Sequence, residues 1–366
     1  MTEPTNMKNK GRVLSGMRPT GKLHLGHYVG ALQNWIKLQE QYQCFFFVAD
    51  WHALTTDYAD TSRVKQSSVE IATDWLAAGL DPAKSTLFIQ SHVPQHAELH
   101  LLFSMVTPLG WLERVPTYKE QRENIKDKDL STYGFLGYPL LQSADILIYQ
   151  ADYVPVGEDQ VPHVELTREV ARRFNQFYWL PEGHEGVTDK ETNRVYVFPE
   201  PQPLLTPAAK LPGTDGRKMS KSYGNAILLS DPEPVVRQKL KTMVTDPARV
   251  RRTDPGNPDV CPVGDLHKIF SDRETMNWVN AGCRTAGIGC IECKSHAADN
   301  IWKVLAPMQE RRRPYEQNPK MVWDILEEGS TKARRVAEHT MKAAREAAHL
   351  SHEYEAPKVD SAEGGK

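Results

Sequence analysis

Short apolar runs alternate with helical patterns along the first half of the chain. Residues 12–16 (RVLSG), 44–50 (CFFFVAD) and 85–91 (STLFIQS) are apolar runs bounded by polar or turn residues, which is typical of buried strands. Between them, apolar side chains recur at helical spacing, first over 25–36 and then over 64–76. This alternation predicts an α/β fold with a parallel, doubly wound sheet.

The pattern changes after the third predicted strand. Residues 92–142 are mostly helical in pattern, so we expect a helical insertion, and residues 151–156 (ADYVPV) predict a return to the sheet. A Pro-rich segment over 198–212 leads into a basic loop over 217–224, and the pattern is helical from residue 231 onward. We therefore expect three parts: a doubly wound domain over 1–230, a helical region over 231–350, and a disordered tail over 351–366.

Composition and charge narrow the possible classes of protein. The 366 residues are enough for two domains, and a hydrophobic content of 40% can supply a core for each. The formal net charge is only -2, so any contact with nucleic acid must come from local basic patches. The N-terminus lacks the apolar core of a secretory signal, and the uncharged runs are too short to cross a bilayer. We expect a cytoplasmic protein with no membrane contact.

Two short motifs carry the candidate chemistry. His24 and His27 lie three residues apart in RPTGKLHLGH, which joins the first predicted strand to the first predicted helix. Doubly wound folds bind nucleotides at this place, because a helix N-terminus offers free amides and a partial positive charge. Lys218 and Lys221 have the same spacing in the glycine-flanked loop RKMSKSYG and can converge on one anion. Either motif alone is more often a packing pair or a solvated turn, but together they supply two clamps for one triphosphate.

The two motifs resemble the HIGH and KMSKS motifs of class I aminoacyl-tRNA synthetases. The resemblance extends through DWHA (50–53), YP (138–139), ADIL (144–147) and GEDQ (157–160). With these, the chain resembles the bacterial tryptophanyl-tRNA synthetases. Members of this family join an amino acid to AMP, release pyrophosphate, and pass the aminoacyl group to the terminal ribose of tRNA. The resemblance implies a Rossmann-like catalytic domain followed by a helical anticodon-binding domain.

The resemblance also implies roles for particular residues. Lys218, Lys221, His24 and His27 would be the catalytic residues, acting on ATP with Mg²⁺. Such catalysis is positioning and electrostatic stabilisation, with no covalent enzyme nucleophile. The implied ATP-binding residues are Arg18, Pro19, Thr20, Gly26, His27, Gly157, Glu158, Asp159, Lys218, Met219, Ser220, Lys221 and Ser222.

Asp145 is the candidate residue for selecting the amino acid. It follows an apolar stretch, where a carboxylate needs a hydrogen-bond donor. In the family this position accepts the indole N–H, while a similar Asp in archaeal-type tyrosyl-tRNA synthetases accepts the tyrosine hydroxyl, so Asp145 alone leaves both substrates open. Leu14 favours L-tryptophan, because the tyrosine enzymes carry a tyrosine there and Leu14 offers only apolar surface. The implied pocket is completed by His52, Gln142, Val154, Val156 and Gln160.

Two features depart from the family pattern. Gln142 stands where many bacterial tryptophan enzymes carry methionine, and HLGH replaces the T-I-G-N form that is common in them. We keep tryptophan as the predicted substrate, with a tyrosyl-tRNA synthetase or a non-catalytic tRNA-binding paralogue as the alternatives. A paralogue without catalysis is disfavoured because it has no reason to retain the whole set His24, His27, Asp145, Lys218 and Lys221.

The cysteines suggest a metal centre late in the chain. An odd number, five, in a reducing compartment argues against a disulfide framework, and Cys44 lies alone in an apolar run, as a core residue would. The other four cysteines lie close together late in the chain. Four thiolates suit tetrahedral Zn²⁺ or a [4Fe-4S] cluster, and the spacing of these cysteines leaves both metals open. A subset of tryptophanyl-tRNA synthetases carries a [4Fe-4S] cluster on a C-x22-C-x6-C-x2-C pattern, so the resemblance implies the cluster. The pattern here is C-x21-C-x6-C-x2-C, formed by Cys261, Cys283, Cys290 and Cys293.

Basic residues concentrate around these cysteines. The resemblance implies that they contact the phosphates of tRNA(Trp), and such binding weakens as salt is added. It also implies a homodimer, with the interface around residues 90–140. The basic residues are Arg237, Lys239, Lys241, Arg249, Arg251, Arg252 and the run 311–313.

Overall fold

The fold is built on a parallel sheet of five strands. The computed structural model describes residues 11–125, 128–206 and 211–350, so the predicted tail over 351–366 lies outside the described residues. The strands follow the order β3-β2-β1-β4-β7, and all neighbours are parallel. This confirms the predicted Rossmann-like fold class. The strands are β1 (Arg12–Met17), β2 (Gln43–Val48), β3 (Ser85–Ile89), β4 (Tyr153–Val156) and β7 (Gln202–Leu205).

Helices cover both faces of this sheet. In the first connection, the helical run over 25–38 contains a π-helical segment, and short 3-10 turns follow β3 and β4. A separate two-stranded antiparallel ribbon joins β5 (Val187–Thr188) and β6 (Val195–Tyr196). The helical segments before residue 230 are α1 (Leu25–His27), η1 (Tyr28–Leu32), α2 (Gln33–Leu38), α3 (Asp50–Asp57), α4 (Val64–Ala78), η2 (Gln90–His92), α5 (Gln95–Val106), α6 (Leu109–Glu113), α7 (Pro116–Asn124), α8 (Tyr133–Ile148), η3 (Glu158–Gln160), α9 (Val161–Phe177) and η4 (Lys221–Tyr223).

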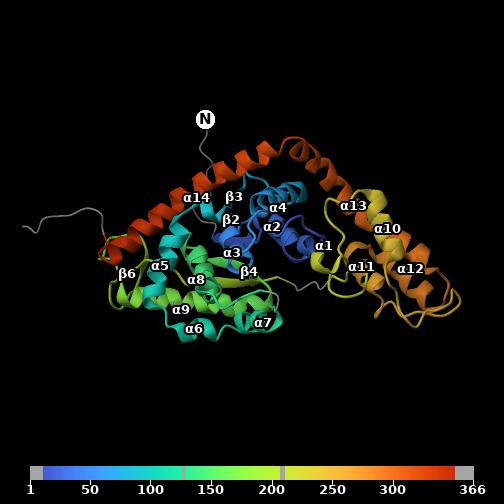
Figure 1. Cartoon of the computed structure of the whole chain (residues 1–366), viewed down its shortest axis with the longest axis horizontal. Helices are drawn as coiled ribbons and strands as arrows, with labels where there is room; N and C mark the ends of the chain where they lie inside the picture. Colours follow the sequence, from blue (N-terminus) through green and yellow to red (C-terminus); the bar gives the residue numbers. More distant parts are fainter. Residues whose placement is uncertain (1–10, 126–127, 207–210, 351–366) are drawn as a thin grey trace, which may run out of the picture.

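The chain after residue 230 is helical in the part that the structure describes. Figure 1 shows α10 to α13 gathered at one end of the elongated molecule, while α14 runs back past the sheet toward β6. Gly329 of α14 lies against β3, where a Cβ at that position would come within 1.8 Å of the Leu87 carbonyl oxygen. The division into 1–230 and 231–350 stays a prediction. The helices are α10 (Glu233–Thr242), α11 (Pro262–Phe270), α12 (Arg273–Arg284), α13 (Cys290–Gln317) and α14 (Pro319–Ala347).

The central strand β2 shows why this sequence forms a two-faced sheet. Successive side chains of a strand point to opposite faces. Phe45 and Phe47 join the core on one face, whereas Cys44, Phe46 and Val48 join the core on the other. Because both sets are apolar, the strand is buried on both sides, as a central parallel strand must be.

The sequence-based prediction missed the short ribbon of β5 and β6 and one strand of the main sheet, β7. The Pro-rich segment was expected only to lead into the basic loop, but it forms β7 at the edge of the sheet. Pro203 pairs with Val154 of β4 there. Proline cannot donate to a ladder and is confined to edge strands, so its presence hides the strand from a pattern search without preventing it.

A buried ion pair connects the C-terminal helices to the loop before α1. Asp74 on α4 is fully buried, accepts the backbone N–H of Leu23 at 2.7 Å, and pairs with Arg312 of α13. Burial raises the pKa of Asp74 to about 6, against the lowering effect of Arg312. Leu23 immediately precedes His24, so this pair anchors the entry to the first motif.

The length and apolar character of the helices can be compared with what a membrane span requires. Within residues 11–125, 128–206 and 211–350, no helix is both long enough and apolar enough to cross a bilayer. The longest, α13 and α14, carry charged residues along their length.

Candidate active site

One cavity lies between the carboxyl ends of β1 and β4 and the helices α3 and α8. Its volume is about 400 Å³. Ligands of doubly wound folds bind in this crevice, outside the carboxyl ends of the strands. All of the residues predicted for the tryptophan pocket line it, namely Leu14, His52, Gln142, Asp145, Val154, Val156 and Gln160.

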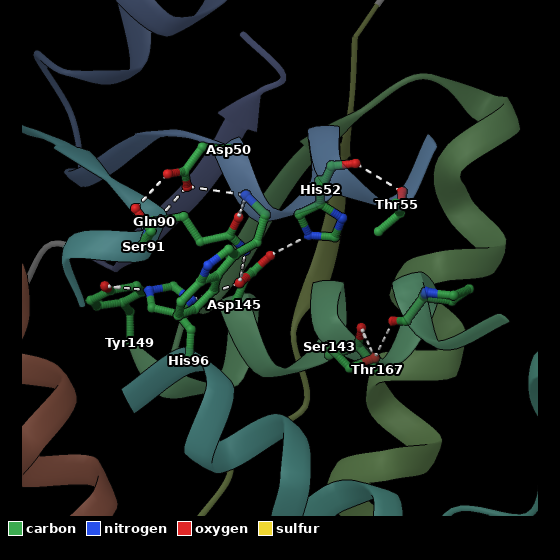
Figure 2. Close-up of polar contacts among 12 residues, drawn as sticks. Asp50, His52, Thr55, Gln90, Ser91, His96, Ser143, Asp145, Tyr149 and Thr167 are labelled. Atoms are coloured by element: carbon green, nitrogen blue, oxygen red, sulfur yellow. Dashed lines mark hydrogen bonds and ion pairs between the residues drawn. The ribbon is translucent and has the colours of Figure 1, made fainter. Parts of the chain in front are cut away.

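Asp145 is the polar centre of the cavity (Figure 2). Its side chain is fully buried, yet both carboxylate oxygens have donors. Oδ2 is 2.7 Å from His52 Nε2, while Oδ1 is 2.7 Å from Gln90 Nε2 and 2.6 Å from His96 Nδ1. Burial alone would raise the pKa of Asp145, but His52 and His96 hold it well below its usual range. Asp145 is therefore an ionised acceptor.

Apolar groups form the walls around this acceptor. Leu14 of β1 is buried at 2% exposure, and Val154 and Val156 of β4 are buried as well. These three side chains carry no hydrogen-bonding group, so a large ring packed against them would meet only apolar surface on that side of the cavity. Gln142 and Gln160 lie in the lining, partly exposed.

The two motif histidines lie at the start of α1. Their ring centroids are 3.8 Å apart. His24 Nδ1 accepts the Gly26 N–H at 3.1 Å, and His27 Nδ1 accepts the His24 N–H at 3.2 Å. Burial and nearby charges lower the pKa of His24 to about 4 and that of His27 to about 3. Both rings are therefore neutral at pH 7, with Nδ1 accepting and the proton on Nε2.

The basic loop closes against the first motif through Lys221. Its Nζ donates to the Thr20 carbonyl at 2.5 Å, to Thr20 Oγ1 at 3.2 Å and to the Gly21 carbonyl at 3.1 Å. Lys218 is exposed, and Ser220 Oγ lies 2.8 Å from Ser222 Oγ. Met219 instead points into the core and is buried, so its side chain does not line the loop surface.

The remaining predicted ATP-binding residues lie on two segments. Arg18 lines the cavity and is held by α3, with Nη2 3.1 Å from Asp57 Oδ2. Pro19, which follows it, is buried. Gly157 also lines the cavity, whereas Glu158 and Asp159 are exposed at its edge.

Comparisons with known proteins agree with this geometry. The family model described as tRNA synthetases class I (W and Y) matches residues 5–306. The chain belongs to this family. Within the family, it is similar to bacterial tryptophanyl-tRNA synthetases over nearly its whole length.

Three relatives of this class I synthetase illustrate the similarity. The tryptophan–tRNA ligase of Thermotoga maritima is 55% identical, over 93% of this chain and 99% of the relative. That of Ralstonia nicotianae is 52% identical, with the same coverage of 93% and 99%. The crystal structure of the Campylobacter jejuni tryptophanyl-tRNA synthetase, complexed with ADP and tryptophan, has a TM-score of 0.79 at 32% identity, covering 93% of this chain and 100% of that one.

Three polar residues of this synthetase were not among the sequence-based candidates. Gln90, His96 and Tyr149 are all fully buried; Gln90 and His96 each bind Asp145, and Tyr149 binds His96. A signal existed for Gln90, because it is a polar residue at the end of an apolar run that predicts a buried strand. His96 and Tyr149 gave no such signal, since their role depends on how α5 and α8 pack together.

The four late cysteines of this synthetase line one small cavity of about 20 Å³. Cys293 Sγ is 3.4 Å from His267 Nε2, and Cys283 Sγ is 3.9 Å from Arg249 Nη1. All four thiols are free. In the part of the chain that the structure describes, no group of three or more His, Cys, Asp or Glu residues has an arrangement that could hold a metal ion. The structure thus gathers the predicted ligands without showing a formed metal site.

Two of the basic residues predicted to meet tRNA are buried, so this prediction was wrong for them. Arg249 is 9% exposed and donates to the Ile288 carbonyl, and Arg312 is 3% exposed and pairs with Asp74. Sequence composition shows a cluster of charge but not which of its members turn inward. Lys241, Arg251 and Arg252 are exposed.

The low pKa of His27 predicts a pH dependence of stability. Unfolded histidine has a pKa of about 6.5, whereas that of folded His27 is about 3. Between these values the unfolded chain binds a proton that the folded chain does not, so the free energy of unfolding falls as the pH is lowered from about 6.5. We expect the free energy of unfolding of His27→Gln to fall less steeply as the pH is lowered, with a slope that corresponds to up to one proton fewer taken up on unfolding. Urea unfolding between pH 7 and pH 4.5 measures this slope. The exposed His339→Gln is the control, and equal slopes for both variants would contradict the prediction.

Proposed function

We propose that the chain is a tryptophan–tRNA ligase. It activates L-tryptophan with ATP, forms tryptophanyl-adenylate and pyrophosphate, and transfers tryptophan to tRNA(Trp). The observation that carries the proposal is the cavity at the carboxyl ends of β1 and β4, which is lined by buried apolar side chains of these strands and by one buried carboxylate. Lys221 of the KMSKS segment joins it to the loop that precedes HLGH, through the carbonyls of Thr20 and Gly21.

The cavity suits an indole ring better than a phenol ring. Indole has one N–H donor and a large apolar surface, and Asp145 is an ionised acceptor. A phenol hydroxyl also needs a donor for its own oxygen. Leu14, where the tyrosine enzymes carry a tyrosine, has only apolar surface to offer, so part of the hydrogen-bonding capacity of tyrosine is lost.

The phosphate side stabilises charge through cations and neutral donors. The tryptophan carboxylate attacks the α-phosphorus, and negative charge accumulates on the departing pyrophosphate. Lys218 and Lys221 would supply positive charge there, and Mg²⁺ that enters with the nucleotide would add further charge stabilisation. His24 and His27 are neutral and donate through Nε2–H, which adds polarity without a further pair of cations beside the lysines.

The helices after residue 230 form the proposed tRNA-binding region. The family transfers its amino acid to tRNA, and a second contact surface must lie away from the adenylate site to read the anticodon. The exposed Lys241, Arg251 and Arg252 lie on this region and suit phosphate contacts. Arg249 and Arg312, being buried, are excluded from that surface.

Exchange of labelled pyrophosphate into ATP tests the reaction and the substrate together. We expect exchange with tryptophan and not with tyrosine or phenylalanine, and labelled tryptophan should then appear on tRNA(Trp) in the same preparations. Lys221→Ala removes one charged transition-state contact and should slow exchange about a hundredfold. Lys320→Ala, an exposed lysine of α14, is the control. Exchange with tyrosine would identify the protein as a tyrosyl-tRNA synthetase instead. No exchange with any of the three amino acids would favour a non-catalytic tRNA-binding paralogue.

We further propose that Cys261, Cys283, Cys290 and Cys293 hold a [4Fe-4S] cluster. Support comes from the chemistry of four thiols around one cavity. The cluster would be a structural or redox centre in the helical region, and the adenylation chemistry has no step that uses it. Zinc bound by the same thiols is the alternative.

Metal analysis of anaerobically purified protein separates these possibilities. We expect iron and acid-labile sulfide in similar amounts, and Cys290→Ser should lower both. Cys44→Ser is the control, because Cys44 is a lone core residue of β2. Zinc without iron would replace the cluster by a zinc site, and absence of both metals would leave the cysteines as packing residues.

We also propose a homodimer that forms through the helical insertion. Apolar side chains are exposed there, with Leu101 at 55%, Met105 at 70% and Leu109 at 62%. Leu101 and Met105 lie four residues apart on α5, so they share one face of that helix. An apolar patch of this kind marks a contact surface.

Sedimentation velocity tests the dimer with two matched charge substitutions. Met105→Glu places a carboxylate in the proposed interface and should shift the protein to a monomer. Val250→Glu makes the same kind of change at another exposed apolar residue, outside the insertion, and should leave the dimer intact. A dimer that survives Met105→Glu would remove α5 from the interface.

A further inference from the structure

The carboxylate of Asp145 has two unlike oxygens. Oδ1 receives two donors, Gln90 and His96, and neither of these residues lines the cavity. Oδ2 receives only His52, which does line the cavity. Oδ1 is therefore the oxygen on the protein side, and Oδ2 is the oxygen on the cavity side, where a ligand can reach it.

His96 also has a hydrogen-bond partner at its other ring nitrogen, away from Asp145. Its Nε2 lies 2.8 Å from the hydroxyl of Tyr149, and both residues are fully buried. Burial raises the pKa of Tyr149 well above its ordinary value, so the phenol keeps its proton and donates it to His96 Nε2. His96 Nδ1 then carries the proton that Asp145 accepts. Each polar atom of this chain has a complementary partner.

Aromatic packing fixes the position of this chain. Tyr149 stacks on Phe45 of β2 with ring centroids 4.8 Å apart, and meets Phe88 of β3 edge-on at 5.3 Å. His96 lies 6.1 Å from Phe47 and 6.1 Å from Phe88. Figure 2 shows Tyr149, His96 and Asp145 in sequence across the site. The hydrogen-bonded chain is therefore held between the sheet and the helices α5 and α8.

We propose that His96, supported by Tyr149, is a positioning residue for substrate selection. By binding Oδ1 it fixes the rotation of the Asp145 carboxylate, so that Oδ2 alone faces the ring of the substrate as an ionised acceptor. The site then selects a ring with an N–H at that point over an isosteric ring without one. This inference rests on the proposed tryptophan-activating function and goes beyond it by naming what orients its acceptor.

The test compares tryptophan with β-(3-benzothienyl)alanine, in which sulfur replaces the ring N–H. Pyrophosphate exchange gives kcat and KM for each substrate. Wild type should prefer tryptophan, and His96→Leu should reduce that preference about tenfold, the factor expected for one hydrogen bond to a charged group. The loss should appear mainly in the KM for tryptophan, with the values for the sulfur analogue within about twofold of wild type.

Two further variants make the result specific to positioning. The amide of His96→Asn can replace the Nδ1 donor, so this variant should recover most of the preference. Tyr149→Phe removes only the rear hydrogen bond and should reduce the preference about twofold to threefold. The control is His92→Leu, the same change on a partly exposed histidine that pairs with Glu327.

The outcomes separate this inference from the function on which it rests. Equal losses with both substrates in His96→Leu, or an unchanged preference, would overturn the positioning role. If His96→Leu does not fold, as judged by its thermal unfolding, His96→Asn and Tyr149→Phe decide, and no change in preference in Tyr149→Phe overturns the proposal. A wild-type protein that shows no exchange with tryptophan would instead overturn the proposed function.

Discussion

The structure is organised around the need to stabilise a charge without water. Asp145 is fully buried, and an ionised carboxylate in that position is costly unless donors surround it. The donors come from separate parts of the chain: His52 from α3, Gln90 from η2 directly after β3, and His96 from α5. The hydrogen bonds to the Asp145 carboxylate therefore fix how these three segments pack against α8. The cavity is the space that they enclose with it.

The phosphate side solves a different electrostatic problem. In the proposed function, Lys218, Lys221 and the HLGH motif bind one triphosphate, and two charged imidazoles beside the lysines would repel these cations and each other. Burial and the neighbouring lysines keep His24 and His27 neutral, so they remain donors while the lysines carry the charge. The two halves of the proposed site thus differ in charge: an ionised acceptor would bind the ring, and cationic and neutral donors together would bind the phosphates.

Local pattern revealed the parts of this design that depend on neighbours in sequence. The buried strands β1 to β3, the HLGH turn and the basic loop are all visible as short runs of residues. Pattern failed for β7, because Pro203 breaks the strand signature although an edge strand tolerates it. It also failed for Arg249 and Arg312, whose burial depends on carbonyl and carboxylate partners brought in by the fold. The role of His96 was missed for the same reason, because nothing in the residues around it in the sequence indicates that it binds Asp145.

Arg312 also shows how the cysteine region is connected to the HLGH motif. It lies near the end of α13, which begins at Cys290, and about 22 residues at about 1.5 Å each separate them by roughly 33 Å. One end of this helix borders the cysteine cavity, and the other holds Asp74, which binds the backbone just before His24. Since a buried ion pair that loses one partner costs about 3–5 kcal/mol, the helix cannot shift away from the phosphate loop at small cost. The placement of the first motif is therefore a property of the C-terminal helices as much as of the sheet that precedes it.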